Sequence, residues 1–241
     1  MEPKIEIEVR NVTKQYRDTT ALKNANLKLT PGIYGLLGPN GAGKSTLMRI
    51  LTLNEKATKG QLFCNGECIQ GENTQYLSLL GYAPQQQNLF ATFSGLRFMY
   101  YMASLKGIPK KMAKEQIEML LKRVNLWEDA TRKIGHYSGG MKQRLLVAQS
   151  LLGEPQFVLL DEPSAGLDPK ERIHLRNLLS KEKKNRIILV ATHIVSDIDT
   201  IADDILFLNK GNLKKISWEK GMDLEKMYIN EFGDHLEEED A

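Results

Sequence analysis

Hydrophobic positions in the first third of the chain predict several strands and one helix. Apolar and polar residues alternate over 5–9 and, more loosely, over 21–29, as in half-buried strands. A short apolar strand is predicted over 33–37, followed by a glycine-rich loop and a helix over 45–53. The Asn65-Gly66 pair predicts a hairpin within 61–70. This region therefore combines an antiparallel edge with the beginning of an α/β core.

The pattern changes over residues 90–133. Glycine is sparse there, and Met, Leu and Lys recur at helical spacing. Gly107-Ile108-Pro109 separates two predicted helices, over 94–106 and 110–124. We interpret this segment as a helical lobe inserted into the core.

After the lobe, predicted helices and strands alternate, as in a parallel sheet with helical crossovers. A hairpin at 209–212 and an acidic tail at 237–240 end the pattern. The alternating elements are helices over 140–152, 169–183 and 195–202 and strands over 156–160, 186–191 and 204–208.

Composition excludes some partners and compartments. The 33 Lys and Arg against 30 Asp and Glu give a net charge of +3, so no nucleic-acid partner is expected. No apolar stretch approaches the ~18 to 20 residues that span a bilayer, and the beginning lacks the apolar core of a signal peptide. Cys64 and Cys68 have no further Cys or His nearby, which favours free thiols over a metal site. We expect a cytoplasmic protein whose membrane role depends on a partner.

A phosphate-binding loop is predicted between the strand at 33–37 and the helix that follows. Its glycines let backbone N–H groups converge on phosphate oxygens, and the helix start adds its positive dipole end. Lys44 supplies a charge to the β- and γ-phosphates, and Ser45 offers a hydroxyl to Mg²⁺. The motif consists of Gly38, Pro39, Asn40, Gly41, Ala42, Gly43, Lys44, Ser45 and Thr46.

Two acidic residues follow the apolar run 157–160. The carboxyl ends of parallel strands are where α/β sheets bind ligands, so both carboxylates are expected at the site. Asp161 is suited to hold Mg²⁺, directly or through water, and Glu162 to orient or deprotonate an attacking water.

A second glycine-rich helix start occurs at Ser138, Gly139 and Gly140. Serine before a helix is a good N-cap, and a purely structural cap explains it equally well. A hydroxyl with unpaired N–H groups at a helix start can also bind phosphate. The chain would then carry two phosphate sites where its own nucleotide needs one.

These motifs in this order and spacing, with His193 after them, resemble the ATP-binding-cassette (ABC) ATPases over nearly the whole chain. The resemblance implies a P-loop NTPase (RecA-like) α/β fold: a parallel-sheet core with an antiparallel β subdomain and an inserted α-helical subdomain. It implies one nucleotide-binding domain over 1–241, with the core and β subdomain in 1–89 and 134–218. The lobe is then 90–133, and 219–241 form a C-terminal helix and the acidic tail.

The same resemblance implies roles for further residues. Tyr16 would stack on adenine, and Gln85 would contact Mg²⁺ and the attacking water and sense the membrane partner. Gln85 is chosen among three consecutive glutamines because it follows Pro84 directly. His193 would contact the γ-phosphate, and Asp168 lies in a loop through which two sites communicate.

In that family, Ser138, Gly139 and Gly140 complete the ATP site of the opposite subunit in a head-to-tail dimer. The family's usual motif is Leu-Ser-Gly-Gly-Gln, whereas Tyr137 and Met141 stand at its two ends here.

The functional expectation is an ATPase subunit that binds ATP and Mg²⁺, with Lys44, Gln85, Glu162 and His193 as catalytic residues. We expect a homodimer on the inner face of the cell membrane, attached through the lobe to a separate transmembrane permease subunit. The motifs resemble the bacterial drug- and peptide-export branch, and no regulatory domain is expected after the last hairpin. The alternatives are a soluble cassette ATPase serving ribosomes, DNA repair or cofactor assembly, and an unrelated phosphate-loop enzyme such as a small-molecule kinase.

Overall fold

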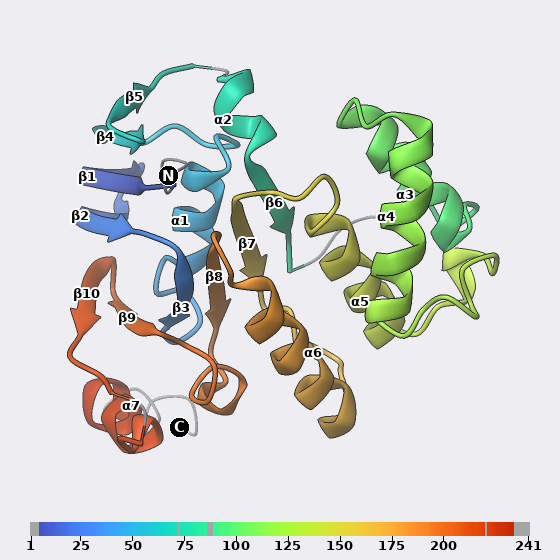
Figure 1. The fold of residues 1–241 in the computed structure, drawn as a ribbon. Helices are drawn as coiled ribbons and strands as arrows, with labels where there is room; N and C mark the ends of the chain where they lie inside the picture. The colour runs from blue at the N-terminus through green and yellow to red at the C-terminus, as the bar shows by residue number, and fades with distance from the viewer. Residues whose placement is uncertain (1–4, 72, 86–88, 220, 234–241) are drawn as a thin grey trace.

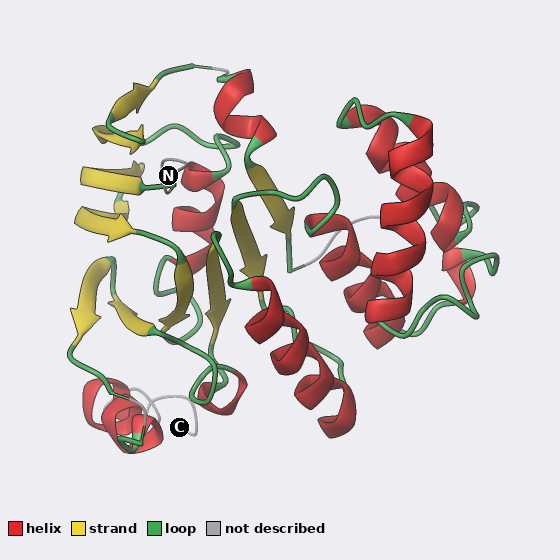
Figure 2. Cartoon of the chain, in the orientation of Figure 1, coloured by secondary structure: helices red, strands yellow, loops and turns green. Residues whose placement is uncertain are grey.

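A six-stranded, mostly parallel sheet forms the centre of the molecule (Figures 1 and 2). The computed structural model describes residues 5–71, 73–85, 89–219 and 221–233. The strand order is β10-β9-β3-β8-β7-β6, and β10 is antiparallel to β9 while the other neighbours pair in parallel. The strands are β3 (Gly32–Leu37), β6 (Leu80–Ala83), β7 (Phe157–Asp161), β8 (Ile187–Thr192), β9 (Asp204–Asn209) and β10 (Asn212–Ile216).

A second sheet, antiparallel and four-stranded, stands beside the first in the order β2-β1-β4-β5. β1 (Ile7–Tyr16) is much longer than the predicted strand over 5–9, and its pairing with β2 contains register shifts. The others are β2 (Thr19–Leu29), β4 (Lys59–Cys64) and β5 (Glu67–Ile69). β4 and β5 form the predicted hairpin at Asn65-Gly66.

Two apolar cores lie on the two faces of the parallel sheet, because its strands are buried on both sides. Along β7, Phe157 and Leu159 face the core shared with α1 (Lys44–Leu51) and the antiparallel sheet. Val158 and Leu160 face the core shared with α5 (Gly139–Ser150) and α6 (Pro169–Glu182). The sheet thereby holds the phosphate loop and the acids of β7 at one edge.

The lobe packs on the α5 side, away from the antiparallel sheet (Figure 1). It contains α3 (Gly95–Leu105) and α4 (Lys110–Arg123), close to the predicted helix bounds. The shorter elements are α2 (Thr74–Ser78), the 3-10 turns η1 (Ile134–His136) and η2 (Val195–Asp197), and α7 (Leu224–Phe232). In the part of the chain that the structure describes, every helix is too short or too polar to cross a bilayer.

Three predictions of secondary structure need correction. α2 and β6 were not predicted, because both are very short. The helix predicted over 195–202 is reduced to η2, since Val195 and Ile198 disfavour helix and the buried Asp197 side chain accepts a hydrogen bond from Ser164. The acidic tail lies outside the described residues, and the division into core, lobe and C-terminal segment stays a prediction.

Candidate nucleotide site

The loop between β3 and α1 fits between two other strands only because it contains glycine. A Cβ on Gly38 would lie 2.3 Å from the carbonyl oxygen of Leu208, and one on Gly43 would lie 2.4 Å from that of Ala21. Gly43 also has φ 113, in the left-handed region that glycine favours. α1 begins there without a side-chain cap, so its first N–H groups are available to an anion.

Lys44, the first residue of α1, folds back over the loop. Its Nζ donates hydrogen bonds to the carbonyl oxygens of Gly38 at 2.6 Å and Pro39 at 3.1 Å. Burial lowers the pKa of the Lys44 ammonium, although the charges of Glu162 and Asp161 act in the opposite direction. The ammonium therefore has weak partners that phosphate oxygens can replace with a gain in charge pairing.

Asp161 is the last residue of β7 and is buried beside the loop. Burial raises the pKa of its carboxyl above the ordinary value, and the neighbouring Glu162 charge raises it too, while a hydrogen bond from Ser45 lowers it. A buried carboxylate next to a second one is electrostatically unfavourable, which a bound cation would relieve.

Glu162 is held in a constrained position directly after β7. Its φ of 50 places it in the left-handed region, which is costly for a residue with a side chain and typical of functional sites. Its N–H donates to the carbonyl oxygen of Ala191 at 2.8 Å, and its own carbonyl accepts from Nε2 of Gln143 at 3.2 Å. β8 and α5 thereby fix the backbone that carries this carboxylate.

The Glu162 carboxylate has a defined orientation as well. Its Oε1 lies 2.9 Å from Nδ1 of His193, and its Oε2 accepts from the Thr192 hydroxyl at 3.2 Å. The His193 side chain is 50% exposed, whereas that of Glu162 is 5% exposed. This arrangement is typical of a general base that is positioned by a second group.

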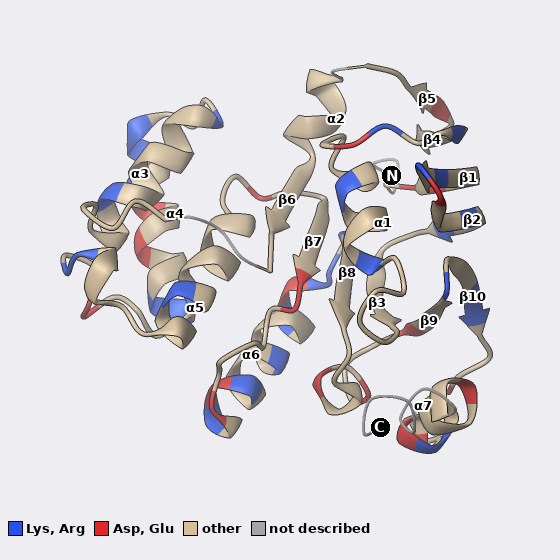
Figure 3. Ribbon diagram, turned by 180° about the vertical axis from the view of Figure 1, so that it is seen from behind, with Lys and Arg blue, Asp and Glu red and all other residues tan. Residues whose placement is uncertain are grey.

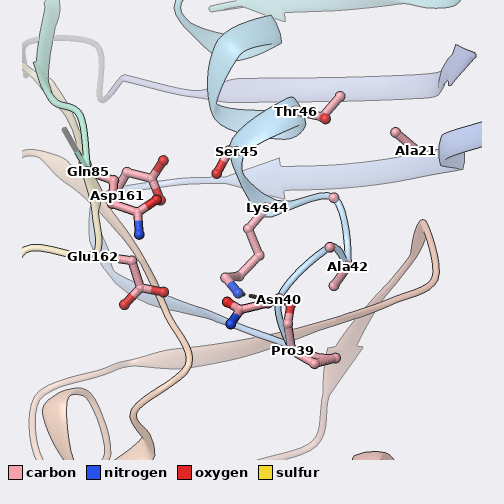
Figure 4. Close-up of a pocket in the computed structure, with 12 residues that line it drawn as sticks. Ala21, Pro39, Asn40, Ala42, Lys44, Ser45, Thr46, Gln85, Asp161 and Glu162 are labelled. Carbon is pink, nitrogen blue, oxygen red and sulfur yellow. Dashed lines mark hydrogen bonds between the residues drawn. The ribbon is translucent and has the colours of Figure 1, made fainter. Parts of the chain in front are cut away.

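These elements enclose a polar cavity of about 240 Å³, into which Lys44 and the two carboxylates are directed (Figure 4). Its lining residues are Ala21, Pro39, Asn40, Gly41, Ala42, Gly43, Lys44, Ser45, Thr46, Gln85, Asp161 and Glu162. Predicted site residues from three separate stretches thus meet in one place, and Gly38 lies beside them through its bond to Lys44.

Six further predicted site residues are not part of this lining: His193, Tyr16, Ser138, Gly139, Gly140 and Asp168. Ser138 caps α5, because its Oγ accepts from the N–H of Met141 at 3.2 Å. Asp168 caps α6 in the same way, with Oδ1 2.9 Å from the N–H of Glu171. A Cβ on Gly140 would lie 3.0 Å from the carbonyl oxygen of Gly166, so the α5 start packs against the loop at 164–168. A Cβ on Gly139 would have no atom of the described chain within 4 Å, apart from its two chain neighbours and the backbone of its own helix turn.

Tyr16 lies at the end of β1, where it pairs with Thr19 of β2. Its hydroxyl bonds to Glu55 and Arg49. Sequence reasoning missed Ala21, Gln143 and Thr192, which no motif singles out. Thr192 had one signal, its place between a predicted strand and His193.

The donor set suits Mg²⁺ in combination with phosphate oxygens. Ser45, Asp161 and Gln85 offer hydroxyl, carboxylate and amide oxygens, the hard ligands that Mg²⁺ prefers, and Mg²⁺ normally shares its coordination with substrate phosphates. Among the described residues no cluster of three or more His, Cys, Asp or Glu could hold a metal alone, and Cys64 and Cys68 are free thiols. Gln86 and Gln87 lie outside the described residues.

Known proteins resemble this chain in sequence and in fold. A sequence profile of the family described as ABC transporter matches residues 22–165. YxlF of Bacillus subtilis (strain 168), an uncharacterized ABC transporter ATP-binding protein, is 34% identical over 213 residues, which are 88% of this chain and 70% of that protein. ABC transporter A family member 2 of Arabidopsis thaliana is 34% identical over 233 residues, 90% of this chain but only 24% of the plant protein.

A solved structure extends this likeness. A dimeric ATP-binding cassette in a post-hydrolysis state, bound to ADP and Pi, superimposes with a TM-score of 0.78 at 25% identity, covering 88% of this chain and 100% of that one. Sequence, fold and the phosphate loop beside two carboxylates agree. The chain therefore belongs to the ABC transporter family, as one of its ATP-binding ATPase domains.

Proposed function

We propose that this domain hydrolyses ATP·Mg²⁺ in the 240 Å³ cavity and thereby powers a membrane transporter. The observation that carries this proposal is the Glu162 carboxylate, held by His193 and Thr192 at the edge of the phosphate loop. The loop and the oriented carboxylate together supply a binding site for phosphates and a base for water.

The phosphates are bound by Lys44 and by the backbone of the loop from Gly38 to Thr46. Lys44 exchanges its carbonyl partners for β- and γ-phosphate oxygens, and the uncapped α1 start faces the same charge. Ser45, Asp161 and Gln85 would hold Mg²⁺. When bound, Mg²⁺ neutralises charge that develops on the phosphate oxygens.

Hydrolysis requires a water in line with the γ-phosphate. Glu162 accepts a hydrogen bond from that water, and His193 fixes the carboxylate and contacts the γ-phosphate. Phosphoryl transfer depends on positioning and charge stabilisation more than on covalent chemistry, which suits this set of residues.

We extend the proposal to a dimer of two copies and to the base of the nucleotide. Ser138, Gly139 and Gly140 complete the site of the second copy, and Asp168 lies in the loop between the two sites. The open space at Gly139 supports this assignment. Tyr16 stacks on adenine, supported by its connection through Arg49 to Thr46, which lines the cavity.

The partner of the dimer is a separate transmembrane subunit that docks on the lobe over 90–133, which would hold the domain on the inner face of the cell membrane. Exposed apolar side chains on the lobe, such as Tyr101, Leu105 and Met112, support a protein partner there.

Lys and Arg alternate with Asp and Glu along α6 (Figure 3), so the charges on this helix do not support a nucleic-acid partner. We propose export of a drug, peptide or similar molecule, on the resemblance of 35–43 and 137–144 to export cassettes.

A pull-down from detergent-solubilised host membranes, with ATP and the Glu162→Gln variant, tests the transport assignment. A multi-span membrane protein in stoichiometric amount is the expected result. Ribosomal, DNA-repair or assembly proteins in its place would overturn transport and leave the ATPase domain standing.

The Glu162→Gln variant also tests the proposed base. Turnover should fall by about 10²- to 10⁴-fold while ATP binding persists, because the amide keeps the shape but cannot accept the proton. Phosphate release and ATP affinity measure the two effects. Glu118→Gln, which alters a surface ion pair on α4, is the control. Undiminished turnover of Glu162→Gln would refute the role.

A further inference from the structure

A cluster of charged side chains surrounds the hydroxyl of Tyr16, outside the lining of the nucleotide cavity. It consists of Lys14, Tyr16, Arg49 and Glu55, here called the Tyr16 cluster. We infer that Glu55 and Arg49 are positioning residues for base recognition, because they fix the Tyr16 ring relative to the phosphate loop. This inference rests on the proposed contact between Tyr16 and adenine.

The first observation is that several hydrogen bonds and ion pairs converge on the Tyr16 hydroxyl and on the Glu55 carboxylate that accepts its hydrogen bond. The Tyr16 hydroxyl donates to the Glu55 carboxylate and accepts from Nη2 of Arg49 at 3.3 Å. Glu55 also binds Nε of Arg49 at 3.1 Å and Nζ of Lys14 at 2.9 Å. Lys14 Nζ in addition lies 4.9 Å from the centre of the Tyr16 ring. A ring at the end of a strand is thereby restrained at its far end.

The second observation is the connection to the phosphate loop. Arg49 belongs to α1, and its Nη2 lies 3.5 Å from the hydroxyl of Thr46, which lines the cavity. The N–H of Glu55 donates to the carbonyl oxygen of Arg49 at 3.1 Å, so Glu55 is held by the end of the same helix. The helix that begins at the phosphate loop therefore also helps to set the position of the Tyr16 ring.

The third observation is that the cluster is charged and partly shielded from solvent. The Glu55 side chain is 18% exposed and that of Lys14 is 15% exposed. Partial burial raises the pKa of Glu55, but hydrogen bonds from Tyr16 and Lys14 lower it further, so the carboxylate stays ionised at neutral pH. Tyr16 itself is 37% exposed, which leaves ring surface for a base. A ring that is already ordered loses less freedom when a base stacks on it.

Two near-isosteric variants separate this role from stacking alone. Tyr16→Phe keeps the ring and removes the hydroxyl, and Glu55→Gln keeps the shape and removes the charge. If the ring alone mattered, Tyr16→Phe would bind nucleotide as well as the wild type. The cluster predicts that each variant weakens ADP binding by about three- to tenfold, the cost of ordering one free side chain.

The experiment measures the affinity of the full chain for ADP and for inorganic pyrophosphate by calorimetry. The variants are Tyr16→Phe, Glu55→Gln, their combination and Tyr16→Ala, with Glu6→Gln, which breaks an ion pair with Lys28 in the same sheet, as control. We expect weaker ADP binding in both single variants, no further loss in the combination, and unchanged pyrophosphate affinity.

Three results would overturn the inference. Additive losses in the combined variant would show that Glu55 does not act through the Tyr16 hydroxyl. An equal loss of pyrophosphate affinity would show a general structural role. Wild-type ADP affinity in Tyr16→Phe and Glu55→Gln, with a loss only in Tyr16→Ala, would leave the stacking contact intact and remove the positioning role. If Tyr16→Ala also binds ADP normally, the proposed base contact itself fails.

Discussion

Two helices of this domain begin at glycine-rich segments, and they are built differently. α1 begins at Gly43 without a side-chain cap and opens into the cavity with Lys44 and the β7 carboxylates. α5 begins with Gly139 and Gly140, is capped by the Ser138 hydroxyl, and lies outside that cavity. The same local motif therefore has two different surroundings.

The difference shows what a helix start needs in order to be a complete site. At α1, β2 and β9 lie close against Gly43 and Gly38, and Asp161 and Glu162 line the same cavity. At α5, the neighbouring loop supplies the carbonyl oxygen of Gly166 and the side chain of Leu167. On our account the α1 start binds phosphate within one chain, and the α5 start acts only against a second copy.

Removing the charge at the α1 start should have the largest effect on binding. Lys44→Met should weaken ATP binding by about 10- to 150-fold, the value of one hydrogen-bonded charge, as measured by calorimetry. Lys106→Met is the control, because the Lys106 ammonium also donates to two carbonyls, of Leu80 and Leu152, away from the cavity. Equal ATP affinity in both variants would contradict the role of Lys44.

A methyl group at the α5 start tests the other half of the comparison. The methyl group of Gly139→Ala meets no atom within 4 Å from any other part of the described chain than its own helix turn, so folding and ATP binding by a single copy should be unaffected. Turnover should nevertheless fall on the order of tenfold, because the methyl group displaces the phosphates of the second copy. Full turnover in a steady-state assay would mean that nothing docks at this helix start.

The two starts should also differ in how pH affects stability. The pKa of the Asp161 carboxyl is raised in the folded chain, so the folded state favours the protonated form. The resulting contribution to the free energy of unfolding is fully present below the ordinary pKa of 3.8 and is lost as pH rises through the folded pKa. Asp161→Asn should therefore raise the melting temperature at pH 7, and the gain should shrink toward pH 4.

Ser138→Ala is the comparison for this measurement. It removes a neutral cap and should cost about 1 kcal/mol of stability at every pH. An Asp161→Asn variant that melts at or below the wild-type temperature at pH 7 would contradict the charge argument. Thermal melts of both variants across this pH range give the answer.

Local patterns predicted much of this fold and of the α1 site. The apolar run of β7 ends where Asp161 and Glu162 begin, and the glycine spacing determines the loop, so both were readable from the sequence. Gln143 and Thr192 were not, because their contacts with Glu162 join residues of different elements. The shortening of the predicted helix to η2 involves, besides local preferences, a hydrogen bond between Asp197 and Ser164 from a separate segment, which the local pattern does not reveal.

The central claim is that the two helix starts meet between copies. Two inactive variants, Lys44→Met and Gly139→Arg, test it when mixed in equal amounts and assayed for ATP turnover. Half of the dimers then pair unlike variants, each with one intact composite site, so turnover should rise to about a quarter of the wild-type value. A mixture no more active than the two separate variants, with both folded, would contradict the account.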